Sequence, residues 1–227
     1  MRRTNFRCTV LLLSALVVAP ALADAPPPSV VGAAPSAGTA AQLGKPAPAF
    51  TLTDTDGKTY RLRDLKGKTV ILEWFNPECP FVKYAHGKGP LVDLAQRVQG
   101  PKVLWLSVNS SAPGKQGHGK DTNAQGKQTF GITNPVLLDE TGVVGKAYGA
   151  QKTPHLFIID PKGVLVYRGG LDNAPMGVPD DTRPRPTSAK SGELVAYVSN
   201  ALAELQQKQA IALADTPSYG CSVKYAD

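Results

Sequence analysis

The sequence lacks a long apolar run beyond its first 23 residues, and it lacks a dense run of lysine and arginine. No later stretch approaches the roughly 18 uninterrupted apolar residues that indicate a membrane-spanning helix. The 25 lysines and arginines are spread along 227 residues without interleaved aromatic side chains, so no basic patch of the kind that binds nucleic acid is predicted. Neither nucleic-acid binding nor stable membrane insertion is therefore expected.

The amino-terminal segment has the pattern of an export signal. Three arginines among the first seven residues precede an apolar run over residues 9–18 and a small-residue A-x-A site at 21–23. This run is too short to span a bilayer, so we expect residues 1–23 to be a cleaved signal peptide. The mature protein is then periplasmic or secreted, and its formal charge of +7 falls by three.

Two further regions follow the predicted signal. Residues 24–45 are rich in Ala, Pro, Ser and Gly and have no acidic residue after Asp24, which predicts a disordered tether. Residues 46–227 carry apolar runs throughout and show no internal repeat. Their length predicts one domain with a substantial core.

Cysteine is scarce, with Cys8, Cys79 and Cys221 as its only positions. Cys8 precedes the apolar run of the signal and leaves with it, so two cysteines remain that could pair in an oxidising compartment. Cys79 follows an apolar strand over 69–75 and a short turn, and Pro80 opens a predicted helix. Helix N-terminal amides favour a thiolate there, which predicts a nucleophile. The alternative is a buried, inert cysteine that acts as a small hydrophobic residue.

The order of apolar runs and turn signals predicts the fold class. The expected strands are 50–52, 59–62, 69–75, 103–108, 135–138, 156–159 and 164–167, and the expected helices are 80–98 with a kink at 87–90, 143–148 and 193–209. The polar segment 110–128 is expected to be a substrate-binding flap or a mobile surface loop, and 172–191 a second loop. This order predicts an α/β sandwich with a mixed central sheet.

Several motifs, taken together, resemble one family. They are Gly44–Phe50, Phe75–Cys79, Thr153-Pro154 before an apolar strand, and Asp160–Gly163, all typical of a thioredoxin-fold redoxin. More specifically, Cys79–Val82, Leu138–Glu140, Lys146–Gly149, Tyr167–Gly169 and Pro217–Tyr225 are similar to the peroxiredoxin-like branch of the alkyl hydroperoxide reductase and thiol-specific antioxidant superfamily. The resemblance extends over residues 44–225. It implies a thioredoxin-like fold with a mixed central β-sheet flanked by helices.

The resemblance also assigns roles to the cysteines. Cys79 matches the attacking cysteine of the thioredoxin C-x-x-C motif, whereas Val82 occupies the resolving position. A resolving partner within the chain must therefore be Cys221. Peroxiredoxins carry a Pro and a Thr before their peroxidatic cysteine, and Leu72 and Asn76 stand at those positions here, which argues against efficient peroxide reduction.

Thr153 and Pro154 match the threonine-proline pair that lies beside the thioredoxin cysteine. The resemblance implies a cis peptide bond and a free backbone edge for a substrate peptide. Glu73, on the strand before Cys79, matches a buried carboxylate that could accept or return the thiol proton. The alternative for Glu73 is an exposed strand end or a pair with a lysine.

Cys221 lies on a tail whose mobility would let its thiol approach and leave the active site. The alternative is a permanent structural disulfide with Cys79. A copper site that joins a cysteine to His86 or His155 is less favoured than two partly exposed histidines, so we expect no metal and no cofactor. Arg168 is predicted to be a surface residue of a hairpin rather than a counter-ion for a thiolate.

The sequence therefore predicts an exported thiol-disulfide oxidoreductase. Cys79 attacks, Cys221 resolves, and Glu73, Thr153 and Pro154 complete the site. The expected partners are a protein disulfide or a hydroperoxide as substrate and an external thiol reductant. The alternatives are a weak thiol peroxidase and a non-enzymatic domain in which the two cysteines form a fixed disulfide.

Overall fold

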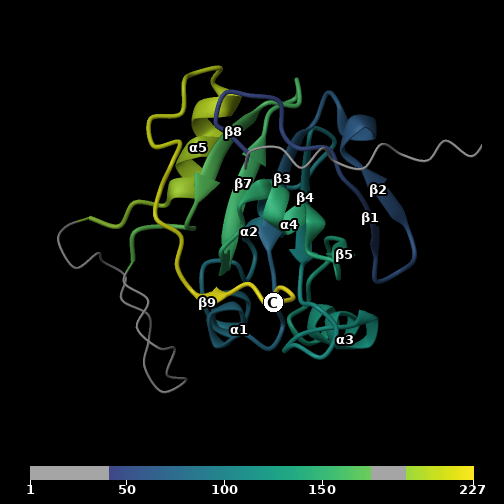
Figure 1. Ribbon diagram of the computed structural model, residues 1–227. Coiled ribbons are helices and arrows are strands. Elements are labelled where there is room, and N and C mark those ends of the chain that lie inside the picture. The colour runs from purple at the N-terminus through teal and green to yellow at the C-terminus, as the bar shows by residue number, and fades with distance from the viewer. Residues whose placement is uncertain (1–40, 175–192) are drawn as a thin grey trace, which may run out of the picture. The chain divides into compact units, whose positions relative to one another are not determined.

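The computed structural model describes residues 41–174 and 193–227 (Figure 1). The predicted signal peptide, residues 24–40 of the predicted tether and residues 175–191 of the second predicted loop lie outside the described residues. The last part of the predicted tether, 41–45, belongs to the folded domain instead. Ala41 is buried and its N–H donates to Ala147 O, while Gly44 N–H donates to Leu165 O.

Seven strands form a mixed sheet in the order β2-β1-β5-β4-β3-β7-β8. β3 and β5 are each parallel to β4, and the other pairs in the sheet are antiparallel. The strands are β1 (Thr51–Asp54), β2 (Thr59–Arg61), β3 (Thr69–Trp74), β4 (Val103–Asn109), β5 (Val136–Leu138), β7 (His155–Ile159) and β8 (Leu165–Gly169). The short strands β6 (Lys152–Thr153) and β9 (Cys221–Ser222) form a separate antiparallel pair.

Helices cover both faces of the sheet, as the α/β prediction requires. They are the 3-10 helix η1 (Leu62–Leu65), α1 (Pro80–Gly87), α2 (Leu94–Val98), α3 (Lys120–Thr129), α4 (Val143–Tyr148) and α5 (Tyr197–Gln206). One face packs its apolar side chains against η1 and α4, and the other packs against α1, α2 and α5 (Figure 1). Within the described parts of the chain, no helix is long and apolar enough to cross a membrane.

Strand β3 lies in the middle of this arrangement, and all six of its residues are buried. A continuous apolar run suits this position, because helices cover both faces of the sheet. Leu72 and Trp74 point to the α4 face, whereas Ile71 points to the α1 face. Side chains alternate along a strand, so Glu73 also points to the α1 face. The strand thus carries a carboxyl group into the core, just before the turn that leads to Cys79.

Three predicted segments differ from the structure. The predicted helix 80–98 is two separate helices, because the chain turns between α1 and α2, where a Cβ on Gly89 would collide with the backbone of Ala85. The last helix begins at Tyr197 rather than residue 193, because Val195 N–H donates to the side chain of Asn173 instead of joining the helix. The polar segment 110–128 contains most of helix α3 and packs against the Cys79 turn, as described below.

Candidate active site

Cys79 lies where β3 gives way to α1. It is the N-cap residue of α1, and Pro80 is at the first helical position, as the sequence predicts. Cys79 N–H donates to Asn76 O and closes the turn, while Cys79 O accepts from Lys83 N–H in the first turn of the helix. The side chain is fully buried and packs with Phe75 and Val82. Burial alone fits the inert alternative, so the neighbours of the sulfur decide its chemistry.

The second cysteine is in contact with the first. β9 pairs with β6 so that Cys221 lies opposite Thr153. The two sulfur atoms, which belong to residues 142 positions apart, are 2.7 Å from each other, and both cysteines are free thiols. Cys79 Sγ is also 3.3 Å from the carbonyl oxygen of Thr153. Two thiols at this separation need only a small approach to reach the roughly 2.05 Å of a disulfide bond.

The Thr153–Pro154 peptide bond is cis, as the resemblance implies. The free backbone edge expected at Thr153 is not present, because the chain's own strand β9 pairs with it. Gly220 permits this close approach, since a Cβ at that position would overlap the carbonyl group of Thr153. The hydroxyl oxygen of Thr153 is buried and finds no hydrogen-bond partner in the described parts of the chain.

Burial raises the pKa of the Cys221 thiol to about 11, and the adjacent Cys79 sulfur adds to the increase through hydrogen bonding and charge. Lys224 and the N–H of Phe81 act in the opposite direction but are weaker. A thiol with this pKa stays protonated near neutral pH. Because the thiolate is the nucleophile, a protonated Cys221 is poorly suited to attack a substrate first.

An asparagine-rich set of hydrogen bonds attaches the polar segment to the Cys79 turn. Asn76 Oδ1 accepts from Glu78 N–H at 2.9 Å, and Asn76 Nδ2 donates to Gln116 O at 3.0 Å. Glu78 Oε2 accepts from Gly117 N–H at 2.5 Å. Asn109 Nδ2 donates to Phe75 O and to Gly117 O. Part of the predicted loop is therefore helix α3, and the segment supports the turn that carries Cys79. Its action as a flap or a mobile loop stays a prediction.

Two glycines make this contact possible. Gly117 has φ +78°, and a Cβ there would overlap the side chain of Asn76. A Cβ on Gly126, in α3, would overlap Pro77. The sequence pattern places Asn76 at the position of the peroxidatic threonine and gives no sign of its role in the turn. The glycines and asparagines of the segment were visible as composition, but nothing in their spacing indicated which backbone groups they would reach.

Glu73 is fully buried, and its carboxyl group has three partners. Its Oε1 is 2.6 Å from His86 Nε2, and its Oε2 accepts from Trp105 Nε1 at 2.9 Å and from Ser107 Oγ at 3.2 Å. The alternative of an exposed or lysine-paired carboxylate is therefore wrong. None of these hydrogen bonds reaches a cysteine, so proton exchange between Glu73 and Cys79 stays a prediction.

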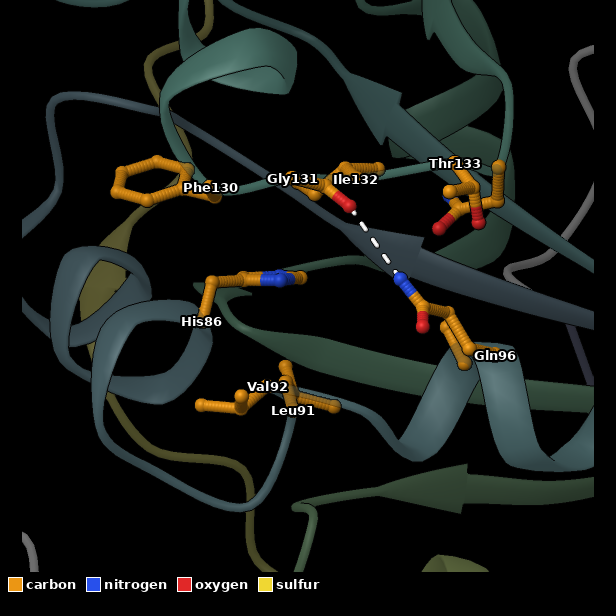
Figure 2. A pocket seen from close by; sticks show the side chains of 10 residues that line it. His86, Leu91, Val92, Gln96, Phe130, Gly131, Ile132 and Thr133 are labelled. Carbon is orange, nitrogen blue, oxygen red and sulfur yellow. Dashed lines mark hydrogen bonds between the residues drawn. The ribbon is translucent and has the colours of Figure 1, made fainter.

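His86 borders a small hollow between α1 and the segment that follows α3 (Figure 2). Its ring lies between Phe130, with which it stacks, and the side chains of Leu91 and Val92. Gln96 Nε2 donates to Gly131 O across the hollow at 3.4 Å. Only 3% of the His86 side chain is exposed, so the expectation of a partly exposed histidine is wrong. The hollow thus reaches His86, the partner of Glu73.

The fold and site can now be compared with known proteins. The Redoxin family profile matches residues 42–180. The chain belongs to the Redoxin family. Thiol-disulfide oxidoreductase ResA of Geobacillus thermodenitrificans is 32% identical over 126 residues, which are 55% of this chain and 67% of that protein. ResA of Bacillus subtilis is 33% identical over 132 residues, covering 54% of this chain and 64% of that protein. The chain thus spans about two thirds of the length of these relatives.

Solved structures agree on the fold of this Redoxin-family protein. An uncharacterized conserved protein from Geobacillus kaustophilus superposes with a TM-score of 0.68 at 31% identity, over 82% of this chain and 93% of that one. A hypothetical protein from Sinorhizobium meliloti gives 0.67 at 24% identity, over 83% and 97%, a likeness that shows the fold alone. The predicted thioredoxin-like fold is confirmed, and the family and the named relatives support the predicted redox enzyme of thiol-disulfide oxidoreductase type.

His155 and Arg168, the other residues weighed from the sequence, have hydrogen-bond partners within this Redoxin-family protein. His155 is buried, contrary to expectation, and its Nδ1 accepts from Gln151 N–H at 3.2 Å. Arg168 forms a two-pronged pair with Asp215, at 3.1 and 2.7 Å, which matches its expected surface position. No group of three or more His, Cys, Asp or Glu side chains within residues 41–174 and 193–227 could hold a metal ion.

Proposed function

We propose that this protein is an exported, periplasmic or secreted, thiol-disulfide oxidoreductase in which Cys79 is the nucleophile and Cys221 the resolving thiol. The observation that carries the proposal is the 2.7 Å separation of the two sulfur atoms beside Thr153. The names of the ResA relatives support the same reaction class. We also propose that the protein belongs to the peroxiredoxin-like branch, because its carboxy-terminal motif resembles that branch.

The reaction has two exchange steps. The Cys79 thiolate attacks one sulfur of a substrate disulfide, so a Cys79–substrate bond forms, the substrate disulfide breaks, and the other substrate sulfur leaves as a thiolate. Cys221 then loses its proton and attacks the Cys79 sulfur, which forms the Cys79–Cys221 disulfide and releases the second substrate thiolate. The substrate is reduced by two electrons and the protein is oxidised. An external dithiol reductant restores both thiols by the same exchange, and the cycle also runs in reverse.

Protein disulfides are the favoured substrates over hydroperoxides. Leu72, at the position of the peroxidatic motif's proline, is buried in the core. Asn76, at the position of its threonine, has its side chain engaged with Gln116 and Glu78. Neither supplies a hydroxyl to a peroxide. We expect oxidation by hydrogen peroxide in stopped-flow experiments to be far slower than the roughly 10⁷ M⁻¹s⁻¹ of a near-diffusional reaction. A rate in that range would make thiol peroxidase the main activity.

The decisive experiment traps the mixed disulfide. A Cys221→Ser variant is incubated with insulin whose disulfide bonds are intact. It should accumulate a covalent Cys79–insulin adduct that mass spectrometry detects and dithiothreitol releases. Cys79→Ser is the matched control and should form no adduct. Absence of the adduct in Cys221→Ser would refute the assignment of the nucleophile.

The non-enzymatic alternative, a fixed disulfide, is tested by the reduction potential of the wild-type pair. Structural disulfides lie below about −300 mV and catalytic ones above that value. We expect the Cys79–Cys221 couple above it, measured by equilibration with glutathione or dithiothreitol buffers. A potential clearly below that value would favour the structural role.

The raised pKa of Cys221 gives a further test of the pairing. Part of the increase to about 11 comes from the Cys79 sulfur. In Cys79→Ser, only burial remains as the main cause, so the pKa of Cys221 should fall below the wild-type value while staying above that of a free thiol. The rate of alkylation against pH measures it. An unchanged pKa would mean that the two sulfurs do not interact in solution.

A further inference from the structure

Cys79 is covered when both cysteines are thiols. Its exposed fraction is 0%, and the position next to its sulfur is taken by Cys221. A disulfide from another protein needs that same position, because the attacked sulfur must come into contact with the attacking one. Substrate access therefore requires the segment that carries Cys221 to move.

The same segment occupies a backbone edge. β9 consists of two residues, and its antiparallel partner is β6, whose Thr153 contacts Cys79 through its carbonyl oxygen. An extended chain from another protein can add to a strand edge in the same way, with its main chain bonded to the strand and alternate side chains placed in pockets. β9 thus places Cys221 beside the Cys79 sulfur, where an added substrate strand would place its own disulfide.

Backbone hydrogen bonds, packing of Val223 on the core and side-chain contacts fasten the chain beyond β9. Val223 N–H donates to Gln151 O at 3.1 Å, and Lys224 O accepts from Ala112 N–H at 2.8 Å. Tyr225 adds a side-chain contact, because its hydroxyl donates to Ala150 O at 2.9 Å. Figure 1 shows this end of the chain crossing from β9, beside α1, toward the carboxy terminus.

Tyr225 fits against the start of α4. Its ring lies over Gly142 and Gly145, where any Cβ would overlap it, and Lys146 Nζ is 5.6 Å from the ring centre. Burial raises the pKa of the Tyr225 hydroxyl, and the nearby Asp139 raises it further, so the hydroxyl stays a donor across the physiological range. Tyr225 is therefore a side-chain anchor that lies four residues beyond Cys221.

We propose that residues 219–225 form a displaceable strap, with Tyr225 as its latch, that holds the β6 edge until an extended, disulfide-bearing segment of a partner protein replaces it. This proposal rests on the proposed function and specifies its substrate class and its regulation. Release of the strap exposes Cys79 for the first attack. Return of the strap brings Cys221 back to the mixed disulfide and expels the partner strand. Loosening the latch therefore speeds the first step and slows the second.

The test compares latch variants in a Cys221→Ser background, so that only Cys79 reacts. Tyr225→Phe keeps the ring and removes the hydrogen bond to Ala150, and Tyr225→Ala removes both. Asp227→Asn is the matched control, because the side chain of this tail residue is exposed and pairs with Lys115 at the surface. The readout is the rate of Cys79 alkylation by iodoacetamide, followed by mass spectrometry.

We expect alkylation to be about fivefold faster in Tyr225→Phe, the factor that corresponds to one typical hydrogen bond, and faster still in Tyr225→Ala. Asp227→Asn should leave the rate unchanged. Equal rates in all four proteins would overturn the strap. Circular dichroism identifies a variant that has simply unfolded, and Tyr225→Phe keeps the test valid if Tyr225→Ala does so.

The second step separates this proposal from the proposed function. With Cys221 present, Tyr225→Ala should close the Cys79–Cys221 disulfide more slowly from a preformed Cys79 adduct with thionitrobenzoate, measured by release of the coloured thiolate. An adduct that forms with unchanged opening and closing rates overturns the strap and leaves the oxidoreductase intact. Failure of Cys79 to form any adduct, even in the latch variants, overturns the oxidoreductase itself.

Discussion

His155 makes the stability of this protein sensitive to mild acid. It begins β7 directly after Pro154, its side chain is buried, and its Nδ1 accepts a hydrogen bond from Gln151 N–H. An imidazolium cannot accept that bond. Burial lowers the pKa of His155 to about 4, and Arg168 lowers it further, while Asp215 acts in the opposite direction. The folded protein thus holds this ring neutral.

The sign and size of the effect follow from the two pKa values. In the unfolded chain this histidine is protonated below its ordinary pKa of about 6.5, whereas in the folded protein it stays neutral down to about pH 4. The stabilisation is therefore complete above pH 6.5 and is lost as the pH falls toward 4. A gap of about 2.5 pKa units, at about 1.4 kcal/mol for each, corresponds to about 3 kcal/mol of unfolding free energy.

The assay is urea unfolding followed by tryptophan fluorescence, at pH values from 7 to 4. Wild-type protein should lose about 3 kcal/mol over this range from His155 alone. Asparagine at this position can still accept from Gln151 but does not titrate, so His155→Asn should lose about 3 kcal/mol less than wild type over the same range. Parallel curves for wild type and His155→Asn would refute the reasoning.

Two further substitutions test the supports of the site. Gly126→Ala should destabilise the protein by about 1–2 kcal/mol in the same urea titration, because the new methyl group overlaps Pro77 and this cost exceeds the helix-propensity gain of about 1 kcal/mol. Gly87→Ala is the control. Its new methyl group meets nothing within 4 Å, so this variant should not be destabilised. His86→Phe keeps a ring in place but removes a hydrogen-bond partner from the buried carboxyl group of Glu73, so we expect a loss of about 1.5–3 kcal/mol. A loss below about 0.5 kcal/mol in either variant would contradict the packing or the hydrogen bond on which it rests.

Local sequence determined those parts of the structure that neighbouring residues encode. A continuous apolar run is sufficient to predict β3, and Pro80 after Cys79 is sufficient to predict where α1 begins. The turn at Asp160 follows from a side chain that accepts from the N–H groups two and four residues later. Each of these preferences acts within a few residues, so it is visible without knowledge of the rest of the chain.

The resemblance to a known family supplied what local preference could not. Nothing in the residues around Thr153 and Pro154 distinguishes a cis from a trans bond, yet the bond is cis as the family pattern implies. The same pattern indicated Cys221 as the expected partner of Cys79. The family pattern also implied a free backbone edge at Thr153 for a substrate peptide. That expectation is wrong, because the chain's own strand β9 pairs with this edge.

Only the tertiary structure decided which distant groups meet. The carboxyl group of Glu73 finds His86 on a helix and Trp105 on the next strand, and the polar segment finds the Cys79 turn through Asn76. Hydrogen bonds from asparagine side chains to backbone carbonyls leave no periodic signal, because the acceptor is present at every residue. Composition therefore made the segment look like a solvated loop. Chain topology, which no local preference records, brought this segment and the tail to Cys79.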